Sequence, residues 1–408
     1  MIQLFQTSKM WDTHTLKKQY DIVIIGAGIH GLATAYYLTK LGVKDIAVLD
    51  QSYIGSGASA RSTAILRANY NTIEGIPFFR ESLKLYEDLA QELDFNMLFD
   101  QMGRVELGHT DPVIMGLRAR AEFNKMLNVD SRMISPEEVK ELVPAIDLRE
   151  GKPLPVMGAL YHPPGGTIRH DAVIWAYGRG ATRGGAELHP FTEVVGFIRQ
   201  KGKNGRVTGV STSRGVISAN IILSAVAGWS SHIASMLDTR LPLSTHALQA
   251  MVTEPLKPLL DKNLSSANFH AYVYQTDRGE IVIGGGVDPY PSYSHGVTLH
   301  QLQELAVHVL EMLPCLRDVK VMRQWAGLCD MSPDYAPIMG SMDNIEGVYT
   351  TCGWGTWGFK AGPIAAKCMA ELIATGQTPD LIRPFTLDRF RTGHLVNERA
   401  AAPAAAIH

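Results

Sequence analysis

The stretch DIVIIGAGIHGLATAYYLTKLGVKDIAVLD, residues 21–50, decides the fold class. The apolar runs at 21–28 and 45–50 predict buried parallel strands, and the segment at 30–42 between them predicts a helix that stops at Gly42. Such a strand–helix–strand unit indicates an α/β protein. Asp50 closes the second strand, 22 residues after Gly28.

The motif GAGIHG at 26–31 predicts a dinucleotide site. Gly26 permits the tight turn out of the strand, Gly28 lets the backbone approach a pyrophosphate, and Gly31 lets the helix pack closely on the strand. The helix N-terminus attracts the anion, and the Asp50 carboxylate can accept the ribose hydroxyls. Glycines in tight turns also occur without ligands, so the prediction depends on strand, helix and carboxylate together.

Composition excludes several classes of protein. The 408 residues are 46% hydrophobic, which is enough for two intertwined domains. The chain has 38 Lys and Arg residues and 40 Asp and Glu residues. This balance lacks the excess of positive charge that typically binds nucleic acid or an anionic membrane. We therefore expect small-molecule ligands.

Location and cofactor chemistry are also constrained by the sequence. The four cysteines occur without CxxC spacing and the N-terminus lacks a signal-peptide pattern, so we expect a cytoplasmic protein with free thiols. No apolar stretch reaches the roughly 20 residues of a transmembrane helix. No metal-ligand or Ser/His/Asp pattern stands out, and we predict no metal site.

Beyond residue 75 the hydrophobic pattern changes to that of amphipathic helices. Residues 77–93 predict an amphipathic helix, and SPEEVKELV predicts another that begins with Ser135 as N-cap and Glu138 closing a capping box. These helices resemble an insertion into the first domain. Residues 244–287 show strand periodicity typical of an antiparallel sheet, followed by a helix at 298–313.

A second glycine-rich element, GVYTTCGWGTWGFKAGPIAAKCMAELI at 347–373, predicts strand, turn and helix. The loop at 55–67 is rich in small residues, as needed near a large planar ligand, although an ordinary loop would look the same. A cofactor that reaches both glycine-rich elements fits extended FAD. Its flavin ring would lie near the second helix N-terminus, whose dipole stabilises negative charge on the reduced ring.

We therefore predict an α/β fold in which a Rossmann-like FAD-binding domain is interleaved with an α+β substrate domain containing a mixed, largely antiparallel sheet. The FAD-binding domain comprises 1–90, 155–243 and 322–408, and the substrate domain comprises 91–154 and 244–321. The low-complexity tail at 400–406 is expected to be disordered or to dock on a partner.

Four motifs together resemble the FAD-dependent amine oxidase family, which includes sarcosine oxidase, D-amino acid oxidase and dimethylglycine dehydrogenase. They are GAGIHGLATAYYL, GASARSTAILRANY, AVAGWSS and CGWGTWGFKAGP. With RQWAGLCDMSPDYAPIM and the C-terminal RFRTGHLVNERAAAPAAAIH, the resemblance to β subunits of heterotetrameric sarcosine oxidases covers essentially the whole chain. It implies α, γ and δ partner subunits.

The resemblance assigns FAD contacts residue by residue. The implied set is Gly26, Gly28, Ile29, His30, Gly31, Asp50, Gln51, Ser59, Arg61, Ser62, Thr63, Val194, Gly228, Trp229, Gly355, Thr356, Gly358 and Lys360. Family members that tether FAD use a cysteine, but Cys329 is not in that register. We expect Cys329 to be a small buried residue and FAD to be non-covalent.

The same resemblance assigns a substrate site. Arg67 matches the arginine that binds the substrate carboxylate in sarcosine oxidases, Lys360 matches a lysine that assists it, and His270 is a candidate neighbour. An arbitrary Arg or Lys is more often a solvated surface cation, but apolar residues beside both indicate enclosure. The implied reaction oxidises an N-methyl secondary amine, and the imine product is hydrolysed to glycine and formaldehyde or passes its one-carbon unit to tetrahydrofolate.

His170 precedes Asp171, which looks like the N-cap of a helix. Taken alone, His170 is a helix-entry residue. The resemblance implies instead that it carries a covalent FMN, which would receive electrons from FAD and deliver them to oxygen, with Arg179 near the FMN phosphate. Ala172 departs from the family pattern, which has a second histidine there.

Two alternatives stay open. One is an L-proline or other secondary-amine dehydrogenase subunit that passes electrons to a carrier. The other is a catalytically silent scaffold that binds FAD only to fold.

Overall fold

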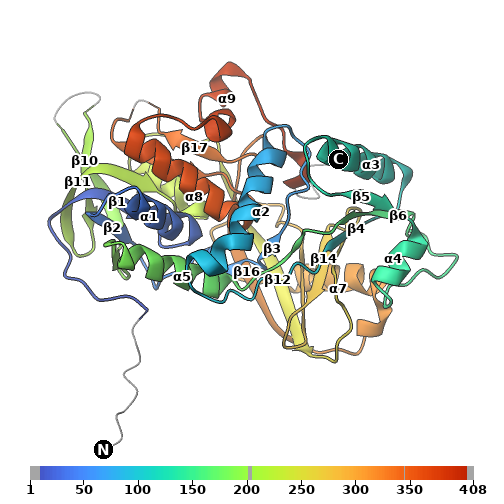
Figure 1. The fold of residues 1–408 in the computed structure, drawn as a ribbon. Helices are drawn as coiled ribbons and strands as arrows, with labels where there is room; N and C mark the ends of the chain where they lie inside the picture. The colour runs from blue at the N-terminus through green and yellow to red at the C-terminus, as the bar shows by residue number, and fades with distance from the viewer. Residues whose placement is uncertain (1–9, 201–204, 344, 402–408) are drawn as a thin grey trace, which may run out of the picture.

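The computed structural model describes residues 10–200, 205–343 and 345–401. Two eight-stranded sheets organise it, and a third, two-stranded sheet pairs β3 (Ile65–Leu66) with β7 (Gly166–Thr167). The two large sheets lie in two lobes, one on the left and one on the right of Figure 1. The mixed architecture of two interleaved lobes confirms the predicted fold class.

The first sheet has a parallel centre in the order β18-β11-β1-β2-β8. β17 and the pair β10-β9 add antiparallel strands to it. The strands span β1 (Gln19–Ile25), β2 (Ile46–Leu49), β8 (Glu187–His189), β9 (Val194–Arg199), β10 (Val207–Thr212), β11 (Gly215–Ser224), β17 (Ile338–Ser341) and β18 (Val348–Cys352). The predicted parallel pairing of the strands around GAGIHG is confirmed.

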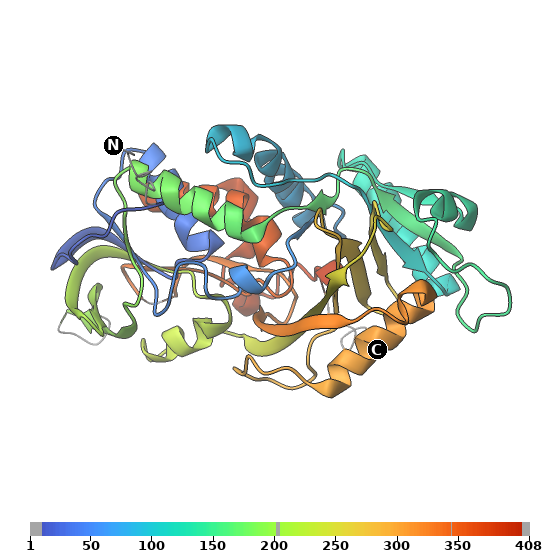
Figure 2. The same ribbon diagram turned by 90° about the horizontal axis from the view of Figure 1, so that it is seen from below.

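β1 is apolar from Ile22 to Ile25 because both faces of the first sheet are covered. Ile22 and Ile24 pack into a core with the helices α1 (Ile29–Lys40), α2 (Gly75–Glu92), α5 (His170–Arg183) and α8 (Gly358–Thr375). Val23 and Ile25 pack on the opposite face with β9, β10, β11 and α6 (Ser230–Ser235). Seen from below, α5 runs alongside α1 (Figure 2). The N-terminal ends of α1 and α8 are thereby fixed against the same sheet.

The second sheet follows the order β16-β12-β15-β14-β13-β4-β6-β5, and only β13 and β4 pair in parallel among its adjacent strands in the described chain. Its strands span β4 (Arg104–Gly108), β5 (Arg132–Ile134), β6 (Gly158–His162), β12 (Ser244–Pro255), β13 (Asn263–Ser266), β14 (Ala271–Gln275), β15 (Glu280–Gly285) and β16 (Val321–Met331). This sheet is the predicted mixed, largely antiparallel one.

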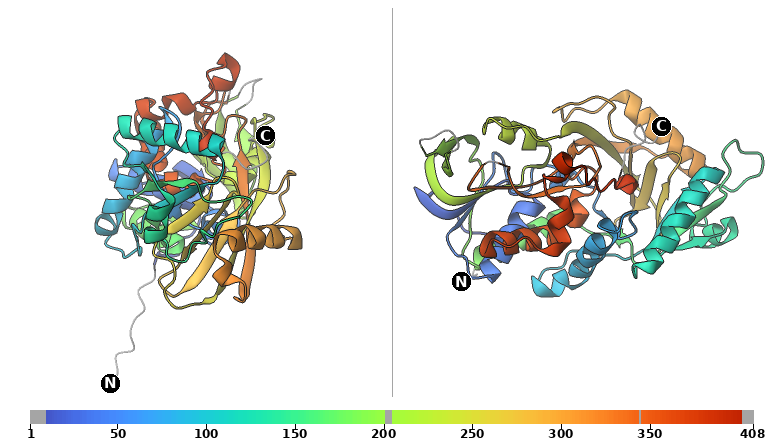
Figure 3. Two further views of the ribbon diagram at one scale, coloured as in Figure 1. Left: turned by 90° about the vertical axis from the view of Figure 1, so that its right-hand side faces the viewer. Right: turned by 90° about the horizontal axis from the view of Figure 1, so that it is seen from above.

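Helices cover both faces of the second sheet. α7 (Leu299–Met312) and α4 (Pro136–Leu142) pack into a core with alternate residues of the strands, such as Val105 and Leu107 of β4. α3 (Asp111–Met126) packs on β5 and β6 from the opposite face, where Leu117 and Ala121 cluster with Leu160. Viewed from above, α2 and α8 lie side by side between the lobes (Figure 3). The capping box of α4 forms as predicted between Ser135 and Glu138.

The secondary structure and strand pairing differ from the sequence-based expectation in two places. From about 76 to 146 we expected long amphipathic segments to dominate, but β4 and β5 also form there. β6 and β16 pair within the second sheet, although the ranges 155–243 and 322–408 assigned them to the FAD-binding domain. Short strands whose burial depends on distant partners carry little local signal. The division into the five ranges stays a prediction.

The expected N-cap of α5 is wrong. α5 begins at His170 after Arg169 as N-cap, so Asp171 lies in the first turn. Its carboxylate pairs with the Arg169 guanidinium at 3.0 Å and accepts a hydrogen bond from the Ala172 N–H. A carboxylate in the first turn still favours the helix dipole.

The C-terminal segment returns to the space between the lobes. The Arg389 guanidinium forms a buried ion pair with Asp334 at 2.8 Å. The Glu398 carboxylate accepts hydrogen bonds from Asn71 N (3.1 Å) and from Thr72 N (3.0 Å) and Oγ1 (2.7 Å). These contacts place Ala400 beside Arg67. Most of the tail at 400–406 lies outside the described residues.

The remaining helical turns are short: η1 (Ser59–Arg61), η2 (Ala227–Trp229), η3 (Pro314–Leu316), η4 (Asp380–Phe385), α9 (Arg389–Thr392) and η5 (Arg399–Ala401). Within the described ranges, every helix is too short or too polar to span a bilayer.

Candidate functional site

A cavity of about 690 Å³ joins the N-terminal ends of α1 and α8 and continues to the second sheet. It is in the size range of small-molecule sites. The residues proposed from the sequence that line it are Gly26, Gly28, Ile29, His30, Asp50, Gln51, Ser59, Arg61, Ser62, Thr63, Arg67, Val194, Trp229, His270, Gly355, Thr356, Gly358 and Lys360. Four proposed residues, Gly31, Gly228, His170 and Arg179, are outside this lining.

The glycines of the first turn allow close backbone contacts. Gly26 has φ +103°, and a Cβ there would lie 2.4 Å from the Ala225 carbonyl oxygen. A Cβ on Gly31 would lie 1.9 Å from the Gly26 carbonyl oxygen, so Gly31 shapes the turn without lining the cavity. Gly28 is the N-cap of α1. Its free backbone faces the cavity, where a bulky side chain would take up ligand space.

Asp50 links β2 to the glycine turn. Its Oδ2 accepts a hydrogen bond from Ala27 N at 2.8 Å, and Oδ1 accepts one from Ser52 N at 2.9 Å. Burial raises the pKa of Asp50, opposed by these two hydrogen bonds. Each carboxylate oxygen has a second acceptor site, which is available to hydroxyl donors in the cavity.

Asp50→Ala is expected to weaken FAD binding about 10- to 150-fold, because hydrogen bonds to a charged group contribute roughly 1.5–3 kcal/mol. The measurement is fluorescence titration of the apoprotein with FAD. Asp50→Asn, which keeps one acceptor oxygen, should show a smaller loss. Equal affinity of the wild type and Asp50→Ala would remove Asp50 from the cofactor site.

The loop after β2 forms the wall of the cavity opposite α1. Ser59 Oγ accepts a hydrogen bond from Ile29 N at 3.0 Å, which ties η1 to the start of α1. Thr63 Oγ1 donates to the Tyr272 hydroxyl at 3.0 Å, and the Tyr274 hydroxyl donates to the Thr63 carbonyl at 2.9 Å. The Arg61 guanidinium instead binds carbonyl oxygens of its own loop, including that of Gly57 at 3.0 Å. Arg61 therefore orders the loop.

The start of α8 is held by His30 of α1. His30 Nε2 donates to the Gly358 carbonyl at 2.8 Å, and its ring stacks on Trp354 with centroids 4.5 Å apart. Burial lowers the pKa of His30 to about 4, so the imidazole is neutral at pH 7. The two glycine-rich turns, more than 300 residues apart in sequence, thus contact each other directly.

Asp330 of β16 shapes the same turn. Its carboxylate accepts hydrogen bonds from Gly353 N at 2.6 Å and Trp354 N at 3.2 Å. Burial raises the pKa of Asp330 to about 7, opposed by these N–H donors. No sequence motif identifies Asp330 as a site residue, because a single acidic residue in a strand has many structural roles.

Arg67 and Lys360 both line the cavity between the lobes. Arg67 Nη1 donates to the Asn69 carbonyl at 2.8 Å, Nη2 donates to the Ala400 carbonyl at 2.8 Å, and the guanidinium lies 4.2 Å from the Tyr70 ring centroid. Burial, with Arg67 and Arg104 nearby, holds the pKa of Lys360 well below its usual value. Both side chains are therefore enclosed, as expected from the sequence.

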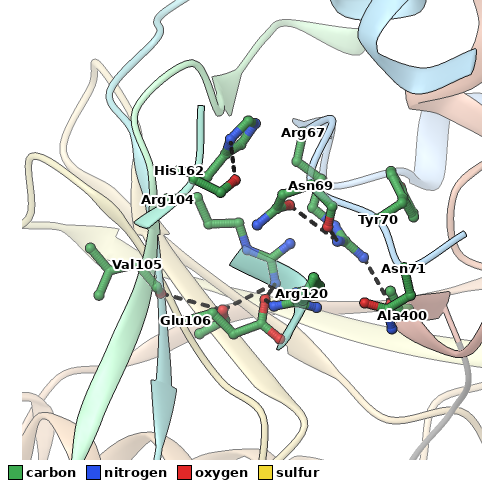
Figure 4. Close-up of polar contacts among 12 residues, drawn as sticks. Arg67, Asn69, Tyr70, Asn71, Arg104, Val105, Glu106, Arg120, His162 and Ala400 are labelled. Atoms are coloured by element: carbon green, nitrogen blue, oxygen red, sulfur yellow. Dashed lines mark hydrogen bonds and ion pairs between the residues drawn. The ribbon is translucent and has the colours of Figure 1, made fainter. Parts of the chain in front are cut away.

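Three further charged residues, which the sequence analysis missed, lie at the same end of the cavity: Arg104, Glu106 and Arg120. Glu106 Oε2 is 2.7 Å from Arg120 Nη2 and 3.3 Å from Arg104 Nη2. The cluster appears with Arg67 in Figure 4. A signal existed: Arg104 and Glu106 alternate with Val105 and Leu107 along β4, so both charges share the face opposite the apolar core.

His270, which the sequence placed on a strand, lies in the turn before β14 and lines the cavity with φ +50°. Its carbonyl accepts a hydrogen bond from Gly286 N at 3.1 Å. Cys329, which we expected to be buried, is buried and lines the cavity as well, and burial raises the pKa of its thiol to about 12. The described residues contain no group of three or more His, Cys, Asp and Glu that could hold a metal ion.

His170 lies behind the cavity wall. α5 packs on η1, whose residues line the cavity on their other side. Burial lowers the pKa of His170, so its imidazole is neutral at pH 7. Arg179 Nη2 donates to the Leu93 carbonyl at 2.7 Å, and the guanidinium lies 4.9 Å from the Phe95 ring centroid. Arg179 thus fastens α5 to the end of α2.

Comparisons with known proteins agree with this geometry. The FAD dependent oxidoreductase family matches residues 21–372. The chain is 42% identical to sarcosine oxidase subunit beta of Rhodobacter capsulatus over 97% of this chain and 95% of the relative, and 41% identical to that of an Arthrobacter species over 97% of each. Both matches extend nearly end to end.

Solved structures share the fold. L-proline dehydrogenase from P. horikoshii is 29% identical with a TM-score of 0.86, over 93% of this chain and 100% of that one. Glycine oxidase from Bacillus cereus is 24% identical with a TM-score of 0.77, over 88% of this chain and 96% of that one. The chain belongs to the FAD-dependent oxidoreductase family and is a homologue of the sarcosine oxidase β subunits.

Proposed function

We propose that this chain is the amine-oxidising β subunit of a sarcosine oxidase. The observation that carries the proposal is the enclosed pair Arg67 and Lys360, at the end of a cavity that begins at the GAGIHG turn. A carboxylate held by these groups would place the amine of a small amino acid near the start of α8. The nearly full-length likeness to sarcosine oxidase β subunits supports the same activity.

The residues of the cavity fit FAD. Gly28 and the first N–H groups of α1 suit the pyrophosphate, Asp50 suits the ribose, and Val194 suits the adenine. Ser59, Ser62, Thr63, Gly355, Thr356 and Gly358 line the part between η1 and α8, which suits the flavin. Cys329 has a strongly disfavoured thiolate, which supports non-covalent binding at this position. When bound, FAD accepts the hydride equivalent, and FMN would take up the electrons and deliver them to oxygen.

The chain's own residues orient the substrate. Arg67 and Lys360 bind the carboxylate, and the surrounding lobes exclude water from the amine. One C–H bond of the sarcosine N-methyl group breaks and a hydride equivalent leaves, the nitrogen lone pair forms the C=N bond, and the nitrogen then releases its proton to give the neutral imine. Water then hydrolyses the imine to glycine and formaldehyde, or the one-carbon unit passes to tetrahydrofolate.

Partner subunits and FMN belong to this proposal. The relatives are subunits of a larger enzyme, and we place this chain with α, γ and δ subunits. The four cysteines are unpaired, which is compatible with the cytoplasm. His170 supports a covalent FMN because its imidazole is neutral and nucleophilic, and because its helix α5 packs on η1, which lines the cavity. The engagement of Arg179 with Leu93 leaves less of that side chain for an FMN phosphate.

His170→Ala is expected to lose all flavin that survives denaturation. In the assembled wild-type enzyme, the peptide that contains His170 should carry an FMN-sized mass after proteolysis, as measured by mass spectrometry. His232→Ala, which changes an exposed histidine of α6, should keep that mass. Release of all flavin from denatured wild-type enzyme would return His170 to a helix-entry role.

Anaerobic reduction of the flavin tests the activity itself. Sarcosine should bleach the flavin absorbance of the purified complex faster than L-proline does. Faster bleaching by proline would favour a proline dehydrogenase subunit, an alternative supported by the likeness to the P. horikoshii enzyme. Bleaching by neither amine would favour a silent scaffold.

A further inference from the structure

The end of the cavity next to α3 contains an excess of positive charge. Arg67, Arg104 and Arg120 line it, and Glu106 is the carboxylate that lies within ion-pair distance of two of them. In Figure 4, Arg104 lies between Arg67 and the Glu106–Arg120 pair. Two of these three guanidinium groups, Arg104 and Arg120, share the Glu106 carboxylate. Buried charge is stable only when it is compensated, so the arrangement calls for further anionic groups.

Hydrogen-bond donors are also left over in this cluster. The Nε atoms of Arg67, Arg104 and Arg120 are buried and have no partner among the described residues. Arg67 is 7% exposed and Arg120 is 8% exposed. A buried N–H without an acceptor is costly. Oxygen atoms of a ligand in the cavity would satisfy these donors.

Neighbouring groups remove only part of the excess. Glu398 is outside the cavity lining, and its carboxylate accepts hydrogen bonds from Asn71 and Thr72 and compensates part of the charge of Arg67. Asp330 lines the cavity, but its oxygens face the N–H groups of Gly353 and Trp354. Arg399 lines the cavity and is basic, whereas burial and the nearby arginines hold the pKa of Lys360, which also lines it, well below its usual value.

His162 packs against the cluster without adding charge of either sign. Its Nδ1 donates to the Asp130 carbonyl at 2.6 Å and its Nε2 accepts from Ala68 N at 3.2 Å, which defines a neutral tautomer. Burial lowers the pKa of His162 to about 3. A monocarboxylate such as sarcosine would therefore neutralise only part of the cluster.

We propose that the cavity selects a secondary amino acid with two carboxylates, one bound by Arg67 and Lys360 and the second by Arg104 and Arg120. The inference rests on the proposed function and names the substrate class of the same site. Glu106 holds Arg104 and Arg120 together, and their free N–H groups face the second carboxylate. The oxidation is unchanged: one C–H bond next to nitrogen breaks, and a hydride equivalent passes to FAD.

Matched substrates test the proposal without any mutation. N-methyl-L-glutamate and N-methyl-L-glutamine differ only in the charge of the distal group. In the assembled wild-type enzyme, anaerobic flavin reduction should give a kcat/KM about 10- to 100-fold higher for the glutamate derivative, as expected for a charge-assisted hydrogen bond. Equal kcat/KM for the two derivatives would overturn the inference.

A pair of arginine variants then assigns the contact. Arg104→Gln should reduce the preference for glutamate over glutamine to near unity, because the cation that faces the distal group is lost. Arg118→Gln changes an exposed arginine of the neighbouring helix α3 and should keep the wild-type preference. An undiminished preference in folded, FAD-containing Arg104→Gln enzyme would contradict the role of Arg104.

The same substrates distinguish an error in the substrate class from an error in the proposed function. If sarcosine and proline reduce the flavin but N-methyl-L-glutamate does so no better than its amide, only the substrate class is wrong. If none of these amines reduces the flavin, the proposed function is wrong as well.

Discussion

Arg67→Ala is expected to lower kcat/KM for the amine substrate roughly 30- to 1,000-fold while leaving FAD content near normal. The loss corresponds to about 2–4 kcal/mol of transition-state binding, the scale of a charge-assisted hydrogen-bond pair in an enclosed site. A guanidinium has five N–H donors, and Asn69 and Ala400 accept three hydrogen bonds from Arg67. The Nε–H and one Nη2–H are left for a substrate carboxylate.

Steady-state kinetics with the assembled enzyme, together with the ratio of flavin to protein absorbance, checks this result. Arg183→Ala, which removes an exposed arginine at the end of α5, is the matched control and should behave as wild type. An unchanged kcat/KM in Arg67→Ala enzyme would show that Arg67 is not the carboxylate ligand. Loss of FAD together with activity would instead assign Arg67 to structure.

The first lobe was predictable because its signals are local. The apolar runs of β1 and β2, and the glycines between them, are forced by burial on both faces and by the close contact of Gly31 with Gly26. β4, β5 and β6 were harder to predict. Their residues form strands because β4 pairs with β13 and β6, and β6 also pairs with β5. Partners so far apart in the sequence leave little local pattern that would predict a strand.

The candidate site likewise contains residues that sequence motifs predict and residues that only the tertiary structure brings to the cavity. Gly28, Asp50, Arg67 and Lys360 stand in motifs, and the structure places all four on one cavity. Arg104, Glu106 and Arg120 come from a short strand and a helix whose relation depends on tertiary structure. On α3, Arg120 shares its buried side with Leu117, Ala121 and Asn124, a position at which a charged residue is itself a signal of function.

The expected N-cap at Asp171 shows a limit of local reasoning. An aspartate before an apolar run is typical of an N-cap, but Arg169 ends the preceding extended segment and pairs with the Asp171 carboxylate at 3.0 Å. Helix ends depend on such contacts and shift by a residue or two. His170 therefore belongs to the first turn of α5 and packs near η1, where its chemistry depends on the cavity wall more than on capping.

Gly28→Val is expected to abolish FAD binding in an otherwise folded chain. The first atom of the new side chain would lie 2.9 Å from Ser59 Oγ, which accepts the hydrogen bond from Ile29 N, and the branched methyl groups would take up the space next to the N-terminus of α1. Both effects remove donors and room that a pyrophosphate requires.

The measurement is flavin absorbance of the purified protein, with circular dichroism to establish that the fold is kept. Gly196→Val is the matched control, because Gly196 lies in β9 away from the cavity and its added Cβ would meet only Ser211 Cβ, at 3.9 Å. A β-branched residue suits a strand, so this variant should bind FAD normally. Full FAD occupancy in Gly28→Val protein would mean that the cofactor pyrophosphate lies elsewhere, and the roles of Asp50 and the α1 N-terminus would be lost with it.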